Sequence, residues 1–237
     1  MKSLCVYPLH VGTITRQLAN FCRGLKPGVV GDLPLICWYI DGSDKKILVD
    51  TGGGDPLQAS HRWLPYSRND DQSVENVLKR IGLTCGDIDI VIVTHMHWDH
   101  TGGNKLFANA KIVVQDIELK NAAAPEAAGN CLPGMIEDVG YTTVSGDTEI
   151  ADGVEVVLTP GHTWGTQGVL VRGRTGRIFL PSDSLPLYKN IETKPFEVSD
   201  IFVDLQVYRE SLDKIAKLSA TILPSHDFEV LKKETYS

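Results

Sequence analysis

The sequence lacks any cysteine arrangement that would indicate a disulfide framework or a thiolate metal site. Its 5 cysteines are odd in number, widely spread and free of any Cys-x-x-Cys pair. Free thiols of this kind suit a reducing compartment, so we expect the protein to act in the cytoplasm. The positions are Cys5, Cys22, Cys37, Cys85 and Cys131.

Long hydrophobic segments are missing as well. No apolar run approaches the length of a membrane-spanning helix. The first residues, Met1 to Pro8, contain no basic region followed by a sustained apolar stretch and a small-residue cleavage site. We therefore expect no membrane partner and no secretory leader.

Positive charge is scarce, with 23 Lys and Arg residues against 30 Asp and Glu. The formal net charge of −7 and the pI near 5.5 argue against DNA or RNA as partners and favour a small neutral substrate. At 237 residues the chain is long enough to pack a core without a metal or a disulfide. No linker or repeat divides it, so we predict a single domain over residues 1–237.

One short stretch is rich in metal-binding side chains. Residues 95–100 have the sequence His-Met-His-Trp-Asp-His, which puts three imidazoles and a carboxylate within six residues. Such groups, once buried, each need a hydrogen bond or a metal. Imidazole and carboxylate together suit zinc, iron, manganese or cobalt. A solvated polar loop is the alternative, but the dense spacing favours a metal-dependent hydrolase.

The cluster follows a segment typical of a buried strand. Ile88 to Thr94 is short, apolar and rich in β-branched residues, and Gly102-Gly103 comes after the cluster. The cluster is therefore predicted to lie on a loop at the carboxyl end of a strand. Ligand-binding groups commonly gather there in α/β proteins.

The hydrophobic periodicity along the chain predicts an α/β fold with two β-rich halves, each with helices on its outer face. The halves are expected to pack sheet to sheet, with polar groups at one edge. The expected strands are 4–9, 33–40, 46–50, 88–93, 111–115, 142–144, 154–159, 167–171, 178–180 and 221–223. The expected helices are 73–81, capped by Asp71 or Ser73, 116–124 and 203–218, and the expected loops are 24–31, 55–71 and 125–141.

Three further candidates follow predicted strands in the second half. They are His162 in Thr-Pro-Gly-His-Thr-Trp-Gly, Asp183 in Pro-Ser-Asp-Ser and His226 in Leu-Pro-Ser-His-Asp. Taken alone, each histidine is more often an ordinary hydrogen-bonded residue, and the aspartate more often caps a turn. Their meaning depends on the cluster at residues 95–100.

Together with that cluster, these positions resemble the metallo-β-lactamase superfamily. Its pattern is His-x-His-x-Asp-His, then a later Gly-His, an Asp and a final His, and every part is present here in order. The resemblance extends from Asp50, in Ile-Leu-Val-Asp-Thr-Gly, to His226. It implies an αββα sandwich of two mixed β-sheets with outer helices and with metals at one edge of the sheets.

The resemblance also implies roles for individual residues. Two divalent ions, zinc first with manganese, iron or cobalt as alternatives, would lie about 3.5–4 Å apart and share a hydroxide that serves as the nucleophile. Asp50 would orient a metal-bound histidine, or else cap a turn. The implied ligands are His95, His97 and His162 for one ion, Asp99, His100 and His226 for the second, and Asp183 as the bridge.

Within the superfamily, the sequence is most similar to the N-acyl-homoserine lactone lactonase branch. The run from Thr94 to Asn104 and the Pro-Ser-His-Asp ending support this similarity. The nucleases insert a large domain, for which there is no room between His162 and His226, and only eleven residues follow His226 where glyoxalase II-type enzymes carry a helical domain. The similarity implies that the protein opens a lactone ring, a quorum-quenching activity, and that Asp99 passes a proton to the leaving oxygen.

One departure from the branch leaves the substrate open. These lactonases often have a tyrosine three residues after the bridging aspartate, where this chain has Pro186. Tyr188 either replaces it near the substrate or lies on the surface. Another lactone, ester, amide or thioester therefore stays possible, as do a mononuclear iron sulfur dioxygenase and a binding module without turnover.

The sequence says less about the substrate pocket. Several aromatic residues near the motifs would line an apolar pocket or, for most of them, pack in the core. The segment from Leu18 to Val30 would form a lid or a homodimer interface, and both roles stay open. The aromatic residues are Trp63, Tyr66, Trp98, Phe107 and Trp164.

Overall fold

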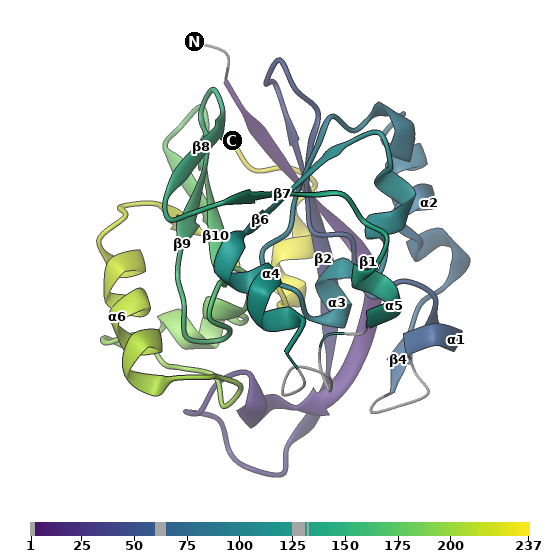
Figure 1. Cartoon of the computed structure of the whole chain (residues 1–237). Helices are drawn as coiled ribbons and strands as arrows, with labels where there is room; N and C mark the ends of the chain where they lie inside the picture. Colours follow the sequence, from purple (N-terminus) through teal and green to yellow (C-terminus); the bar gives the residue numbers. More distant parts are fainter. Residues whose placement is uncertain (1–2, 60–64, 125–130, 132) are drawn as a thin grey trace.

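The computed structural model describes residues 3–59, 65–124, 131 and 133–237. The chain forms an αββα sandwich, as the sequence predicts. A seven-stranded sheet has the order β4-β1-β2-β3-β5-β6-β7, and a five-stranded sheet has the order β12-β11-β10-β9-β8. Helix α6 covers the outside of the smaller sheet, and α2 lies on the far side of the larger one (Figure 1).

The seven-stranded sheet comes entirely from residues 5–144. β1, β2 and β3 are antiparallel neighbours, and β3, β5, β6 and β7 are parallel. The carboxyl ends of β3 and β5 therefore meet at one edge. The strands are β1 (Cys5–Gln17), β2 (Val30–Asp41), β3 (Ile47–Val49), β4 (Tyr66–Ser67), β5 (Ile90–Ile92), β6 (Lys111–Gln115) and β7 (Tyr141–Val144).

The five-stranded sheet comes from residues 148–222. β8 to β11 pair antiparallel in sequence order, and β12 joins β11 in parallel. Strands β9, β11 and β12 therefore run in the same direction, and their carboxyl ends share an edge. The strands are β8 (Thr148–Ala151), β9 (Val154–Leu158), β10 (Gln167–Arg172), β11 (Arg177–Leu180) and β12 (Thr221–Ile222).

Two of the helices, α2 and α6, begin at side-chain caps. The Ser73 side chain accepts a hydrogen bond from the Asn76 N–H and caps α2, and Asp204 caps α6 through the Val207 N–H. Within the described residues, no helix has both the length and the apolar character needed to cross a membrane. The helices are α1 (Pro56–Ala59), α2 (Val74–Arg80), α3 (Trp98–Thr101), α4 (Asp116–Ala122), α5 (Pro133–Ile136) and α6 (Leu205–Ala216).

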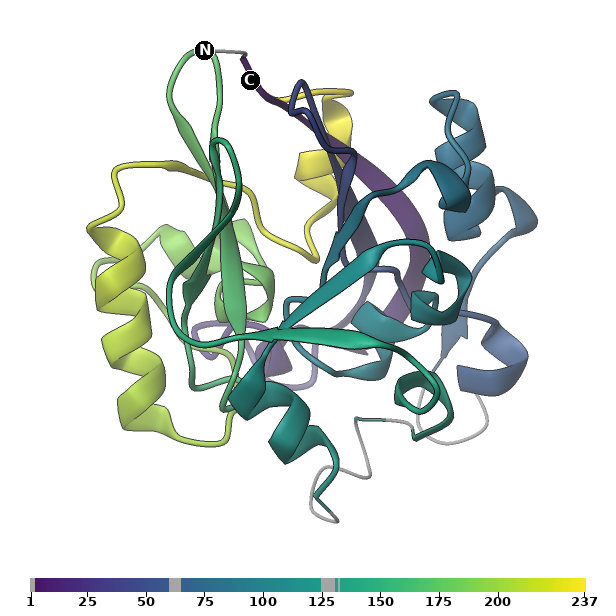
Figure 2. The ribbon, with the colours of Figure 1, turned by 45° about the horizontal axis from the view of Figure 1, so that its top comes forward.

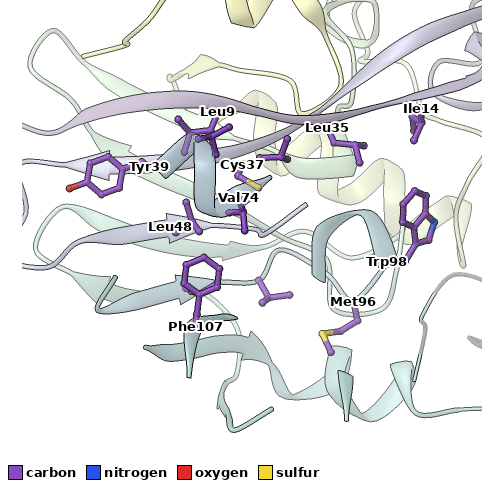
Figure 3. Packing of buried hydrophobic residues seen from close by; sticks show 14 of the residues in the cluster. Leu9, Ile14, Leu35, Cys37, Tyr39, Leu48, Val74, Met96, Trp98 and Phe107 are labelled. Atoms are coloured by element: carbon purple, nitrogen blue, oxygen red, sulfur yellow. The ribbon is translucent and has the colours of Figure 1, made fainter. Parts of the chain in front are cut away.

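The alternation of side chains along the strands explains the layers. In β2, Leu35 and Cys37 face the helices outside the larger sheet, whereas Ile36 and Trp38 face the space between the sheets. Figure 3 shows the outer core, in which Leu35 and Cys37 pack with residues from several other elements. A third core lies under α6, whose inward positions recur at helical spacing. These are Tyr208, Leu212 and Ile215.

The structure differs from the predicted elements where the sequence pattern is interrupted. β1 continues to Gln17, far beyond the predicted strand 4–9, because a bulge between His10 and Gly12 resets the alternation. β2 begins at Val30, so the predicted loop 24–31 is wrong at its end. The short elements α1, β4, α5 and β8 carry too few residues to show a period. Residues 125–130 and 132 of the predicted loop 125–141 lie outside the described residues.

Candidate metal centre

Four of the candidate residues come from one loop of the larger sheet. His95 and His97 lie on the short loop after β5, and Asp99 and His100 lie in α3, which begins directly after His97. In Figure 1, α3 lies in the lower middle of the molecule and the two chain ends lie above it, and Figure 2 shows the chain ends close together at the top. The loop therefore projects at the edge where β3 and β5 end.

The other three candidates come from the smaller sheet, one from each of three strand ends. His162 follows β9, Asp183 lies in a short 3-10 turn after β11, and His226 follows β12. Because these strands run in the same direction, their ends meet at the edge that faces the first loop. Residues far apart in the sequence are thus brought to one place.

The first group consists of three imidazoles, His95, His97 and His162, whose ring nitrogens all lie within 4.8 Å of one another. His97 Nδ1 is 3.0 Å from His162 Nε2. The ring centroid of His95 lies 4.5 Å from that of His97 and 4.8 Å from that of His162. Three facing ring nitrogens form a donor set that zinc and similar ions take.

The second group consists of Asp99, His100 and His226, again with donor atoms within 4.8 Å. Asp183 lies between the two groups. Its Oδ1 atom is 3.0 Å from His226 Nε2 and 3.2 Å from His100 Nε2. Its Oδ2 atom is 3.5 Å from His162 Nε2. One carboxylate therefore reaches ligand atoms of both groups.

Two buried nitrogen atoms show that the site suits a cation. His95 is 0% exposed and His100 is 2% exposed, and among the described residues neither Nε2 atom has a well-aligned hydrogen bond, although His100 Nε2 lies 3.2 Å from Asp183 Oδ1. A buried polar atom without a partner destabilises a fold by about 1–3 kcal/mol. Divalent ions would pair with both atoms, so the residues present fit a metal centre.

The electrostatics of the two groups differ. Burial and the neighbouring imidazoles lower the pKa of His95 and His97 well below its ordinary value. Neutral imidazole is the form that coordinates metals. Burial also opposes protonation of His100, but the carboxylates of Asp50 and Asp183 outweigh it and raise the His100 pKa well above the ordinary value. The negative charge of Asp50 and Asp183 is therefore concentrated around His100.

Asp50 holds the His100 ring. It follows β3 directly, at a φ of 60°, and its Oδ2 atom accepts a hydrogen bond of 2.7 Å from His100 Nδ1. The Thr94 N–H and hydroxyl each donate to the same carboxylate at 2.8 Å, and the Ser182 hydroxyl donates to the Thr94 hydroxyl at 2.7 Å. With Nδ1 engaged, His100 presents Nε2 toward Asp183.

Backbone carbonyls hold two other rings in the same way. His162 Nδ1 donates to the Ile201 carbonyl at 2.9 Å, and His226 Nδ1 donates to the Pro34 carbonyl at 2.9 Å. Each contact leaves Nε2 free to face the centre of the site. Both acceptors lie far in the sequence from the histidines that they hold.

Glu118 on α4 is a site residue that the sequence analysis missed. It is 2% exposed, and it accepts hydrogen bonds from the Met96 N–H at 2.8 Å, the Gly165 N–H at 2.9 Å and the Thr163 hydroxyl at 2.7 Å. It thus ties the loop of the first four candidates to the loop after His162. No local signal separates Glu118 from an ordinary helix carboxylate such as Asp116.

Glycine is required where two motif loops pass close to other backbone. Gly161, just before His162, has a φ of 132°, and an added Cβ would lie 2.3 Å from Tyr208 Cα. A Cβ on Gly102 would lie 2.3 Å from the carbonyl carbon of Gly53. The glycine runs after Asp50 and after the cluster therefore pack against each other.

Tyr188 lies apart from the seven candidates. Its N–H donates to Asp227 at 2.9 Å, and its side chain packs with Tyr236 beside the inter-sheet core. Burial and the nearby Tyr236 hydroxyl raise the Tyr188 pKa to about 12. None of these contacts of Tyr188 is with the seven candidates, and its substrate role stays a prediction.

The aromatic residues near the motifs divide between core and surface. Tyr66, Trp98 and Phe107 are buried in the outer core (Figure 3 shows the last two), and Trp98 also lines a small cavity at the site. Trp164 is 39% exposed. Trp63 lies outside the described residues.

The segment Leu18 to Val30 reaches the second group. The Phe21 ring packs edge-on against His226 with centroids 5.3 Å apart, and the Phe21 carbonyl accepts a hydrogen bond of 2.9 Å from the Asn190 side chain. This part of the segment therefore covers the site, whatever further role the segment has.

Known proteins resemble this chain in both sequence and fold. The N-acyl homoserine lactonase of a Bacillus species is 31% identical over an alignment of 218 residues that covers 86% of this chain and 86% of the relative. The lactonase of Bacillus cereus is 30% identical over 97% of this chain and 94% of its own. A solved N-acyl homoserine lactone hydrolase, with the product N-hexanoyl-L-homoserine bound at its catalytic metal center, has a TM-score of 0.87 and 26% identity, covering 98% of this chain and 96% of that chain.

The family profile described as the metallo-beta-lactamase superfamily matches residues 31–226, a range that holds all seven candidates. This match covers well over half of the chain, and the lactonase relatives extend the similarity to almost its full length. The chain therefore belongs to the metallo-beta-lactamase superfamily, in the branch of the N-acyl homoserine lactonases.

Proposed function

We propose that this protein is a dinuclear metal-dependent hydrolase that opens the ring of an N-acyl-homoserine lactone or a related small lactone. The observation that carries the proposal is the pair of donor groups joined by Asp183, together with the buried Nε2 atom of His95, which has no hydrogen-bond partner among the described residues. The lactone is supported by the relatives, which are lactonases, and by the solved neighbour that holds an acyl-homoserine product.

Seven side chains would hold the two ions, and zinc is the ion we expect first. Divalent ions bound there would polarise the scissile carbonyl and make a water acidic enough to serve as nucleophile near neutral pH. The ligands would be His95, His97 and His162 for one ion, Asp99, His100 and His226 for the other, and Asp183 shared.

In this proposal, side chains of the protein carry a proton, orient a metal ligand and limit water at the site. Asp99 lies in the first turn of α3 and lines the cavity at the site, which supports a role for its carboxylate in carrying a proton to the leaving oxygen. Asp50 keeps the His100 ring in one orientation through the contact at 2.7 Å. Ile14, Phe21 and Ile201 form apolar walls that limit water around the reacting groups.

A substrate panel tests the proposal. Protein loaded with zinc, manganese or cobalt is mixed with acylated and plain lactones, aryl esters, β-lactams and thioesters, and hydrolysis is followed by proton release. We expect the lactones to be hydrolysed fastest, with no turnover after the metal is stripped. Activity on another class together with silence toward lactones would contradict the substrate while leaving the fold intact.

Metal analysis separates the proposal from its main alternative. We expect two ions per chain in protein purified without added metal. One iron per chain, with oxygen consumption in the presence of a persulfide, would instead identify a sulfur dioxygenase. Two ions without any hydrolysis would favour a binding module.

A further inference from the structure

A small cavity of about 30 Å³ opens at the metal-facing side chains. A ligand that approached the metal-facing side chains would pass the residues that line this cavity. Part of its lining is the candidate ligands His97, Asp99, His162 and Asp183. The remaining lining residues are Ile14, Arg16, Phe21, Trp98 and Ile201.

Arg16 is the only lysine or arginine among these described lining residues. It lies on β1 two residues after Ile14, so both side chains project from the same face of the strand. The Arg16 Nε atom is buried and has no hydrogen-bond partner in the described part of the chain. A buried donor without an acceptor is unfavourable, which a bound ligand would correct.

The surroundings of Arg16 indicate what kind of acceptor fits. Burial lowers the Arg16 pKa, while the nearby carboxylate of Asp99 raises it, so the guanidinium charge already has a counter-charge. The walls beside it, Ile14, Phe21 and Ile201, are apolar, and the Trp98 indole is the one other side-chain donor beyond the candidate ligands. Because Asp99 already supplies a negative charge beside Arg16, the partner that Arg16 Nε still lacks is a neutral acceptor.

We propose that Arg16 is a substrate-binding residue that donates a hydrogen bond to a neutral carbonyl oxygen on the acyl substituent of the substrate. It would thereby select acylated lactones over lactones that carry only an alkyl chain. The proposal rests on the proposed lactonase function. It also names a donor near the site in a chain that has Pro186 where related lactonases have tyrosine.

Two matched lactones test this role. One is N-hexanoyl-homoserine lactone, and the other is a γ-butyrolactone with an α-alkyl chain of equal length and no side-chain carbonyl. Arg16→Leu should lower kcat/KM on the acylated lactone about 10-fold or more, and on the alkyl lactone less than about 2-fold. Arg16→Lys should fall between wild type and Arg16→Leu, because lysine keeps the charge but not the planar donor.

Arg209→Leu is the control, because Arg209 lies exposed on α6 and should change neither rate. Thermal unfolding of each variant shows that the fold is retained. Equal losses on both lactones, or no loss on either, would overturn the proposal. A larger loss on a lactone that bears a carboxylate would also overturn it, because Arg16 would then be an anion-binding residue.

A binding measurement separates this proposal from the proposed function. Calorimetry on the metal-loaded protein compares ring-opened N-hexanoyl-homoserine with the ring-opened alkyl acid. Arg16→Leu should weaken the binding of ring-opened N-hexanoyl-homoserine about 10-fold and change the binding of the ring-opened alkyl acid by less than about 2-fold. If wild type hydrolyses neither lactone, the proposed function fails, and the calorimetric ratio alone decides the role of Arg16. An unchanged ratio means that Arg16 does not contact the acyl group.

Discussion

The two sheets bring their side chains to the same edge in different ways. The larger sheet contributes four candidates within residues 95–100, all from one loop and the short helix that follows it. The smaller sheet contributes three residues, one from each of three strand ends. A dense motif can be recognised locally, whereas residues dispersed between positions 162 and 226 acquire meaning only through the parallel direction of β9, β11 and β12.

The comparison also separates two electrostatic roles. The loop of the larger sheet supplies His95 and His97, whose pKa values fall because of burial. The smaller sheet supplies Asp183, whose pKa falls well below the ordinary value because His226 and His100 outweigh the effect of burial. The smaller sheet has fewer candidates, but its Asp183 is the one carboxylate among the described residues whose two oxygens face both groups. Four substitutions test whether the two contributions are as distinct as this suggests.

The largest effect is expected from Asp183→Asn, which replaces the carboxylate between the two donor groups by a neutral amide. Metal content should fall from two ions per chain to one or fewer, and kcat/KM should fall on the order of 10³-fold, or ~4 kcal/mol in the activation free energy. Elemental analysis and lactone hydrolysis measure both. Asp204→Asn is the control, because Asn also caps a helix such as α6. Full occupancy by two ions in the Asp183 variant would show that the groups do not depend on it.

Asp99→Asn tests the larger sheet's own carboxylate. Because Asp99 is assigned both a ligand and a proton-carrying role, turnover should fall about 100-fold or more, while metal content falls less. Parallel measurement of kcat and bound metal distinguishes the two roles. Asp116→Asn, at an exposed position of α4, should have no effect. Normal turnover at full occupancy would remove Asp99 from the mechanism.

Asp50→Asn tests whether Asp50 stabilises metal binding only at the second group, which contains His100. The variant weakens the contact that orients His100, so the affinity for one of the two ions should fall about 10–100-fold. Competition with a chelating dye measures both affinities. Equal weakening of the two ions would show that Asp50 stabilises the whole edge instead of the second group.

The smallest effect on catalysis is expected from Glu118→Gln, at the contact between the two loops. An amide cannot accept all three hydrogen bonds that Glu118 accepts, and one buried partner left unpaired costs about 1–3 kcal/mol. For a chain of this size, each kcal/mol lowers Tm by about 2–4 °C. Glu75→Gln, on the exposed side of α2, is the control. An unchanged Tm would mean that the two loops hold together without Glu118.

The predicted fold is confirmed at the level of its layers and most of its strands, because buried strands such as β3 and β5 have continuous apolar runs. The predicted helix 73–81 is confirmed as α2 with its Ser73 cap, since Val74, Val77 and Leu78 recur at helical spacing. The bulged half of β1 could not be predicted, because a bulge shifts the faces of all residues beyond it. That half contains Arg16.

The sequence by itself determined the donor types, their order along the chain and their positions after strands, because ligand chemistry and hydrophobic periodicity are local properties. It also identified the family through the spacing of residues 95–100. Only the tertiary structure decided which atoms face one another, since distances such as that from Asp183 to His100 depend on how two sheets pack. For the same reason, Glu118 and Arg16 emerged only in three dimensions. Their surroundings come from segments distant in the chain, and no local pattern records them.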